Sequence, residues 1–307
     1  MQILAPVVLI ITMGWVLVRT GFLSNPAVGE LNRLTYWVGL PALLIQRIGT
    51  AAPDFGRVGD MLSVLLLATG VSVLVAALVA RLWRLPGQSF VTFVHGAYRG
   101  NLTFIGLPVV IYAFAGSPEA STYEAVALVA FVPLVVIYNI VAVTVMQLPG
   151  RQAPMVALSR VARGVATNPI LLGTLLGVLL ALSPLALPLA ADRTLAAVGQ
   201  MALPLALIGI GGGLYATRIR GRVRWAVGAA ALKTTVGPLA GLFFGVTFGL
   251  STDELRLALV FLACPTASAA YVLVQQMDGD TALVASTIVL SHLFALPVML
   301  LVLALTA

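Results

Sequence analysis

Hydrophobic residues run along the chain in long blocks separated by short polar stretches, and this pattern continues from end to end. Each block is about as long as the ~20 residues that a helix needs to cross the hydrocarbon core of a bilayer. No polar stretch is long enough to form a soluble domain. The pattern predicts an all-α polytopic membrane protein with ten transmembrane helices, near residues 2–20, 30–48, 61–83, 89–115, 121–147, 165–187, 194–216, 224–249, 254–276 and 281–305.

Two of the ten blocks contain residues that interrupt a helix. A spanning helix can be broken only where the freed backbone groups face protein or a water-filled cavity. Broken helices at corresponding places in two halves of a chain are typical of the substrate site of secondary transporters. We therefore expect helices 4 and 9 to cross at their interruptions. The predicted helix-break residues are Gly106 and Pro108 in the fourth block, and Cys264 and Pro265 in the ninth.

The proline positions predict an internal repeat. Four pairs keep one offset: Pro6 and Pro169 differ by 163, Pro41 and Pro204 by 163, Pro133 and Pro297 by 164, and Asn101 and Pro265 by 164. Because a repeat of five helices is odd, its second copy enters the membrane from the opposite side, and the repeats are inverted. We predict the first repeat over residues 1–147, a cytoplasmic linker over 148–163, and the second, inverted repeat over 164–307.

Composition agrees with a membrane protein. Hydrophobic residues make up 61% of the chain and charged residues only 9%, with a mean hydropathy of +1.09, whereas a soluble domain has about 25% charged residues. The N-terminus runs straight into apolar sequence without the basic start of a signal peptide, so it is predicted to be the first helix. The net charge of +7 comes mostly from loop arginines and indicates no nucleic-acid partner.

The distribution of loop arginines predicts the orientation. Loops after odd-numbered helices hold eleven arginines and loops after even-numbered helices hold four, counting Arg47 among the latter. Cytoplasmic loops carry the excess of basic residues. The odd-numbered loops are therefore expected in the cytoplasm and both termini on the outer side.

Two cationic residues, Arg99 and Lys233, fall within predicted helices, whereas all ten acidic residues fall in loops or at helix ends. An ionisable residue at membrane depth costs ~3 kcal/mol or more, so it marks a candidate functional site. Together with helix N-termini at the breaks, these cations favour an anionic ligand, most simply a carboxylate. Two alternatives stay open: Arg99 snorkels towards an interface, or Lys233 bonds the free carbonyls of a broken helix.

Polar residues beside the two breaks complete the candidate site. Their side chains can bind a ligand, or they can cap the freed backbone groups locally. The predicted substrate-binding residues are Arg99, Gly100, Asn101, Thr103, Asn139, Lys233, Pro265, Thr266 and Ser268.

The sequence indicates no catalytic, metal or cofactor site. His95 and His292 lack metal-ligand spacing and carboxylate partners. Cys264, the single cysteine, is interpreted as a small packing residue rather than a nucleophile. Since no base and nucleophile are paired, we expect no enzyme activity.

Three segments together resemble the auxin efflux carrier family, which includes bacterial permeases labelled malonate or malate transporters and the plant PIN-FORMED auxin carriers. These segments are residues 31–44, 99–108 and 265–280, and the resemblance extends over essentially the whole chain. The chain departs from plant members in having Gly100 where they carry proline and in lacking their long central loop. Gly70, the repeat equivalent of Lys233, also offers no acid to pair with a cation.

The resemblance implies a fold and a mechanism. It implies ten helices in an inverted 5+5 repeat, a fold related to that of sodium/proton antiporters and bile acid symporters, with Asn101 and Pro265 as crossover residues. It implies an elevator with helices 1, 2, 6 and 7 as scaffold and helices 3–5 and 8–10 as transport domain. It further implies a homodimer formed through helices 2 and 7, in the inner membrane of a bacterium.

The expected function is secondary transport of small organic anions, mono- or dicarboxylates, by alternating access. The main alternative is a sodium-coupled symporter, for which Asn101, Thr266 and Ser268 offer oxygen ligands. A membrane receptor or an intramembrane enzyme fits the sequence less well.

Overall fold

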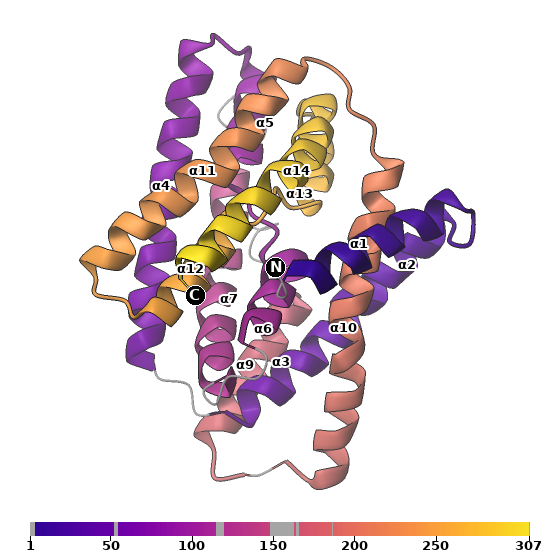
Figure 1. The fold of residues 1–307 in the computed structure, drawn as a ribbon, viewed down its shortest axis with the longest axis vertical. Coiled ribbons are helices and arrows are strands. Elements are labelled where there is room, and N and C mark those ends of the chain that lie inside the picture. Colours follow the sequence, from indigo (N-terminus) through magenta and orange to yellow (C-terminus); the bar gives the residue numbers. More distant parts are fainter. Residues whose placement is uncertain are drawn as a thin grey trace. The chain divides into compact units, whose positions relative to one another are not determined.

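The computed structural model describes residues 4–51, 55–114, 120–147, 163, 166–185 and 187–306, and these residues are almost entirely helical (Figure 1). The predicted linker over 148–163 lies outside the described residues, except for Arg163. The chain divides into two compact units. Unit 1 comprises Met1–Gly59, Thr103–Pro133 and Ala162–Ala216, and unit 2 comprises Asp60–Leu102, Leu134–Val161 and Thr217–Ala307.

The long helices are those of a polytopic membrane protein. Within the described residues, five helical segments are long and apolar enough to cross a bilayer: Phe55–Leu82 in α4, Thr122–Met146 in α7 (Ala120–Gln147), Leu189–Ala216 in α10, Val223–Thr247 in α11 and Thr281–Leu305 in α14. Shorter apolar helices include α1 (Leu4–Arg19) and α9 (Pro169–Leu182). Ten membrane spans and the inverted repeat stay predictions.

In unit 1, residues 25–49 form one continuous helical run. It comprises α2 (Asn25–Leu34), the π-helical turn η1 (Thr35–Gly39) and α3 (Leu40–Gly49). Ser24 caps its start by accepting a hydrogen bond from the Ala27 backbone N–H. Pro41 has no N–H to donate and would break a regular helix interior. Here it follows directly on the π turn, so the helix continues through it.

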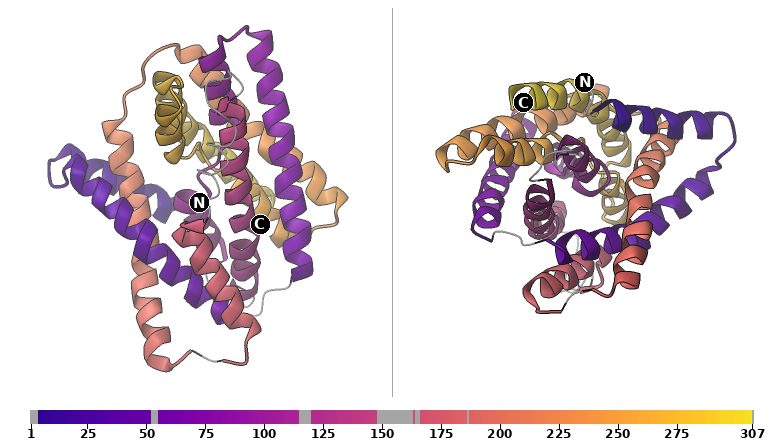
Figure 2. Two further views of the ribbon diagram at one scale, coloured as in Figure 1. Left: turned by 180° about the vertical axis from the view of Figure 1, so that it is seen from behind. Right: turned by 60° about the horizontal axis from the view of Figure 1, so that its bottom comes forward.

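Close helix packing holds unit 1 together. Helix α1 lies along α10, and α3 lies along α9 and α10 (Figures 1 and 2). A methyl group at Gly14 of α1 would overlap the backbone carbonyl of Ile208, and one at Gly177 of α9 would lie 2.9 Å from the Leu44 carbonyl oxygen. Small residues at such contacts let helix backbones approach closely, as is typical of membrane helices.

Unit 2 is built around α11, which packs against α5 (Gly87–Tyr98), α12 (Thr252–Ala263) and α14. Helix α14 also contacts α5, α12 and the short α13 (Ala269–Gln276). The two interrupted segments of the sequence analysis, α5 and α12–α13, therefore share one helical environment.

Several arginines that the charge count assigned to loops lie in helices instead, among them Arg19 of α1 and Arg256 of α12. Arg47, which the charge count assigned to a loop, belongs to the last turn of α3. Its guanidinium pairs with Glu124 at 2.8 Å, and the Glu124 side chain is only 5% exposed. Arg47 is therefore held by a partner inside unit 1.

Candidate functional site

The first interruption follows α5. The helix ends at Tyr98, Arg99 has an extended backbone, and helical structure resumes at Leu102 in the π-helical turn η2 (Leu102–Gly106). Gly106 and Pro108 lie inside the helical run formed by η2 and α6 (Leu107–Phe114), so their assignment to the break is wrong. Proline is tolerated at Pro108 because it follows a π turn and occupies the first turn of α6.

The second interruption lies where the sequence predicts it. Helix α12 ends at Ala263 and α13 begins at Ala269, with Cys264 and Pro265 between them. The Pro265 ring disfavours helical backbone at the residue before it, and Cys264 has φ −51° and ψ 141°. The Cys264 Sγ donates to the Val260 carbonyl at 3.3 Å within the core of unit 2, which fits a packing role.

The two interruptions pair with each other. Gly100 and Thr266 form an antiparallel bridge. The Asn101 N–H donates to the Pro265 carbonyl at 2.8 Å, and the Ala267 N–H donates to the Arg99 carbonyl at 3.0 Å. Each broken helix thus satisfies backbone groups of the other, which the absence of water in a bilayer requires.

Thr266 ties this crossing to α5 and to a further helix, α14. Its hydroxyl donates to the Gly96 carbonyl in α5 at 2.8 Å, and its N–H donates to the Ser291 hydroxyl in α14 at 2.9 Å. Thr266 is fully buried, so its contacts are those of a structural residue. Ser291 is not among the predicted site residues, because nothing in the sequence distinguishes it from the other hydroxyl residues of the last hydrophobic block.

Lys233 supports the same crossing from α11. Its Nζ donates to the Leu262 carbonyl at 2.7 Å, and the residue is 3% exposed. Leu262 lies in the last turn of α12, where carbonyls lack partners within the helix. A methyl group at Gly100 would lie 3.5 Å from this Nζ. The contact matches the second alternative for Lys233, a lysine that bonds a broken helix, and it keeps the nitrogen beside the crossing.

Arg99 is half-buried and is held by α7. Its Nη2 donates to the Asn139 side-chain oxygen at 2.7 Å, and its Nη1 approaches the Tyr138 carbonyl at 3.4 Å. These contacts orient the guanidinium within unit 2. Unlike Lys233, Arg99 keeps part of its surface accessible.

The remaining candidates differ in exposure. Asn101 is 3% exposed, whereas Ser268 is exposed at the N-cap of α13. Thr103 lies in η2, belongs to unit 1 and is largely buried. The structure therefore brings Arg99, Gly100 and Asn101 together with Asn139, Lys233, Pro265 and Thr266, all of them in unit 2.

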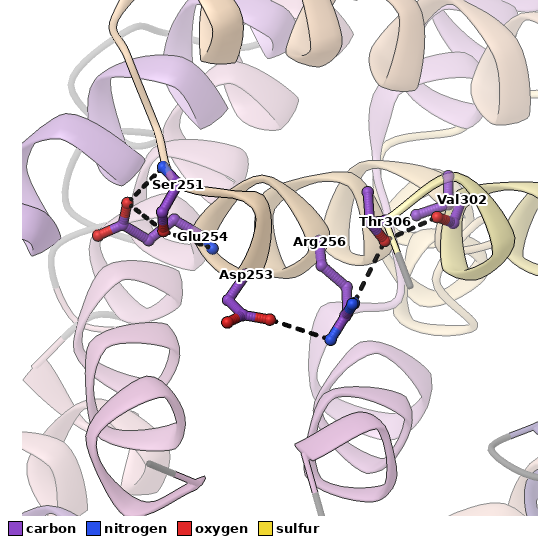
Figure 3. A network of polar contacts seen from close by, with 6 residues as sticks. All are labelled: Ser251, Asp253, Glu254, Arg256, Val302 and Thr306. Carbon is purple, nitrogen blue, oxygen red and sulfur yellow. Dashed lines mark hydrogen bonds and ion pairs between the residues drawn. The ribbon is translucent and has the colours of Figure 1, made fainter. Parts of the chain in front are cut away.

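Helix α12 is anchored at its far end (Figure 3). Ser251 and Glu254 form a capping box in which each side chain bonds the backbone of the other. Arg256 donates to Asp253 at 3.0 Å and to the Thr306 hydroxyl just after α14 at 3.2 Å. These contacts fix the start of the helix that carries Pro265 into the crossing.

A family model described as membrane transport protein matches residues 1–303 of the chain. The chain belongs to this family, the auxin efflux carrier family. This confirms the resemblance that the three sequence segments carry. No curated protein sequence matches the chain. Family membership and the apolar helices together make the protein a multi-pass membrane transporter.

The crossing of this transporter offers hydrogen-bond donors and cationic groups. Among the described residues, no group of three or more His, Cys, Asp or Glu side chains could hold a metal ion. The guanidinium of Arg99 and the hydroxyl of the exposed Ser268, at the N-cap of α13, are accessible donors of unit 2 next to the crossing. Guanidinium groups and helix N-termini both favour anions.

Proposed function

We propose that the transporter carries small organic anions, mono- or dicarboxylates, and binds a substrate carboxylate beside the crossing of unit 2. The observation that carries the proposal is the half-buried Arg99 guanidinium, fixed by Asn139 at the point where the two broken helices pair. An arginine pre-oriented by an amide can form short, charge-assisted hydrogen bonds to a carboxylate. Asn101 and Ser268 are further donors to the substrate.

Lys233 and Thr266 act mainly as positioning residues in this proposal. Both bind backbone carbonyls at the crossing, those of Leu262 and Gly96. Lys233 adds a buried nitrogen next to Gly100, which favours negative charge in the substrate.

Alternating access is proposed to follow from an inverted five-helix repeat. Helix contacts in unit 1 support it: Gly14 packs against the backbone of Ile208, and Gly177 packs against that of Ile45. Adding 163 to 14 and 45 gives 177 and 208. The two contacts are therefore equivalent under the offset derived from the prolines.

Contacts between equivalent positions support the same symmetry. In unit 1, a methyl group at Gly39 would lie 3.1 Å from the Cβ of Ala202, and 39 plus 163 is 202. In unit 2, Asn101 bonds Pro265, and 101 plus 164 is 265. Within each unit, a pseudo-two-fold relation between the two repeats explains why the residue meets its own equivalent.

We further propose an elevator in which helices 3–5 and 8–10 form the transport domain and move past a scaffold of helices 1, 2, 6 and 7. Unit 1 contains α1, α3, α9 and α10, which correspond to the proposed scaffold helices 1, 2, 6 and 7, together with Thr103–Pro133. In the proposed arrangement both termini face outward, the membrane is a bacterial inner membrane, and two copies associate through helices 2 and 7.

Flux of radiolabelled malonate into proteoliposomes tests the anion site. Arg99→Gln is expected to lower malonate flux at least tenfold, since a charge-assisted hydrogen bond contributes ~1.5–3 kcal/mol. Lys233→Ala is expected to lower flux sharply as well. Arg81→Gln, an exposed arginine of α4 in the same unit, is the matched control and should leave flux unchanged.

The proposal is wrong if Arg99→Gln retains full flux, or if the wild-type protein carries no carboxylate against any gradient. Repeating the assay with and without a sodium gradient distinguishes a sodium-coupled symporter from a uniporter or proton-linked carrier.

A further inference from the structure

Unit 1 contains a cavity of about 330 Å³ at the C-terminal end of α3. Helices α3, α6, α7 and α10 all contribute to its wall. Its volume falls at the lower end of the ~300–1,000 Å³ typical of small-molecule sites. Its polar lining residues are Gln46, Arg47, Thr50, Tyr112, Glu124 and Gln200.

An ion pair with unequal exposure lies in the wall of this cavity. The Arg47 Nη1 and the Glu124 Oε2 are 2.8 Å apart, and their side chains are 44% and 5% exposed. Glu124 therefore sits behind the arginine, and Arg47 is the accessible member of the pair. A guanidinium has five N–H donors in a planar fork, and one carboxylate oxygen at Nη1 leaves others directed elsewhere.

A buried acid behind an accessible arginine is suited to binding a second carboxylate. The buried partner fixes the guanidinium in place, which reduces the entropy lost when a ligand binds. Neighbouring amides and hydroxyls, those of Gln200, Thr50 and Tyr112, can accept or donate hydrogen bonds to the rest of a small polar ligand. Gln46 is held separately, since its Nε2 donates to Asp192 at 3.1 Å.

We propose that this cavity is a second binding site for organic anions, with the accessible edge of Arg47 as the carboxylate ligand. The inference rests on the proposed function for the identity of the anion. In the proposed orientation α3 ends on the outer side, so the cavity binds the anion at the outer face of unit 1.

Two substitutions in the same ion pair test the proposal because they should act in opposite directions. Arg47→Gln removes the ligand and is expected to raise the KM for malonate about tenfold while maximal flux is retained. Glu124→Gln keeps an oxygen for Arg47 but removes the competing negative charge, and it is expected to lower KM about threefold. A structural ion pair would instead show the same direction of change in both variants.

The control is an exposed ion pair that does not line this cavity. The Arg33 Nη1 and the Glu30 Oε2 lie 3.7 Å apart in α2, and the two side chains are 73% and 74% exposed. Arg33→Gln and Glu30→Gln are expected to leave KM unchanged. Shifts in KM of the same sign for Arg47→Gln and Glu124→Gln, or shifts opposite to those stated, as a cationic ligand would give, overturn the proposal.

A binding measurement separates this inference from the transport proposal. In purified protein carrying Arg99→Gln, malonate should still raise the melting temperature through the unit 1 cavity, and adding Arg47→Gln should abolish that increase. Absence of any carboxylate flux in the wild type would contradict the proposed function. A different pair of results would contradict the second site alone. In that case the wild-type protein shows normal malonate flux, but malonate does not change the melting temperature of the Arg99→Gln protein.

Discussion

The two interrupted segments of unit 2 bring different residues to a shared pairing. The α5 segment contributes Gly100 and Asn101, and the α12 segment contributes Pro265 and Thr266. Asn101 donates its backbone N–H to the Pro265 carbonyl, but Pro265 has no N–H with which to return the bond. The pairing between these equivalent positions is therefore one-sided.

Other groups reinforce the α12 side. Lys233 bonds the Leu262 carbonyl, and Ser291 accepts from the Thr266 N–H. On the α5 side, the Arg99 side chain remains partly accessible and is oriented by Asn139. The difference indicates that the two sides have different roles. The α12 side holds the crossing in place, and the α5 side presents the group that contacts substrate. The following variants test these two roles.

Gly100→Val should have the largest effect. A Cβ at this position would lie 3.3 Å from a Leu102 methyl and 3.4 Å from the Lys233 Cε, and valine adds two more carbons. Overpacking of this kind costs ~1–3 kcal/mol, and here it also displaces the lysine that holds α12. We expect a lower melting temperature and near-complete loss of malonate flux in proteoliposomes.

The matched control is Gly70→Val in α4, where a Cβ would meet nothing within 4 Å. Gly70 is the repeat equivalent of Lys233, and both glycines belong to the part of unit 2 that comes from the first half of the chain. Equal losses of flux in the two valine variants would show that the crossing has no special sensitivity.

Lys233→Met should come next. Methionine keeps much of the side-chain volume but removes the bond to the Leu262 carbonyl, and an unsatisfied buried group costs about 1–3 kcal/mol. We expect a clear fall in melting temperature together with reduced flux, whereas Arg99→Gln should reduce flux with little change in melting temperature. A Lys233→Met protein that melts like the wild type would contradict a fixing role for the α12 side.

The sequence predicts the membrane architecture and the second interruption better than the first. The predicted block 281–305 coincides with α14. Pro265 marks the break between α12 and α13, because proline restricts the backbone of the residue before it. The first break has no proline at the pairing, and Gly100 and Asn101 are ordinary residues in a hydrophobic run. Pro108 drew the prediction to a later position, where a π turn lets the helix continue.

Long-range partners were beyond the reach of the sequence. Lys233 could be identified as unusual from its depth, but its bond to Leu262 depends on how α11 packs on α12. The Arg47–Glu124 pair joins residues 77 positions apart. Arg47 and Glu124 each lie near the end of a hydrophobic block, where charged loop residues are expected, so neither stands out in the sequence.

Thr266→Val should have a moderate effect. The two side chains have nearly the same shape, so the change removes mainly the hydroxyl bond to the Gly96 carbonyl at 2.8 Å. A hydrogen bond of this kind contributes about 1 kcal/mol, and the Gly96 carbonyl also loses its partner. Thermal unfolding should show a small destabilisation. Thr144→Val is the control, since the exposed Thr144 donates to the Ile140 carbonyl of its own helix at 2.9 Å.

Ser251→Ala should have the smallest effect. It tests a difference between the N-terminal ends of α12 and α5. Helix α12 starts with the capping box of Ser251 and Glu254 (Figure 3), whereas α5 starts after Pro86 without a side-chain cap. Loss of a serine cap costs ~0.5–2 kcal/mol. We expect a slightly lower melting temperature and unchanged KM for malonate, because the cap lies at the opposite end of α12 from Pro265. A raised KM in Ser251→Ala would mean that the start of α12 controls the geometry of the crossing. The cap would then also belong to the groups that position the substrate-contacting α5 side.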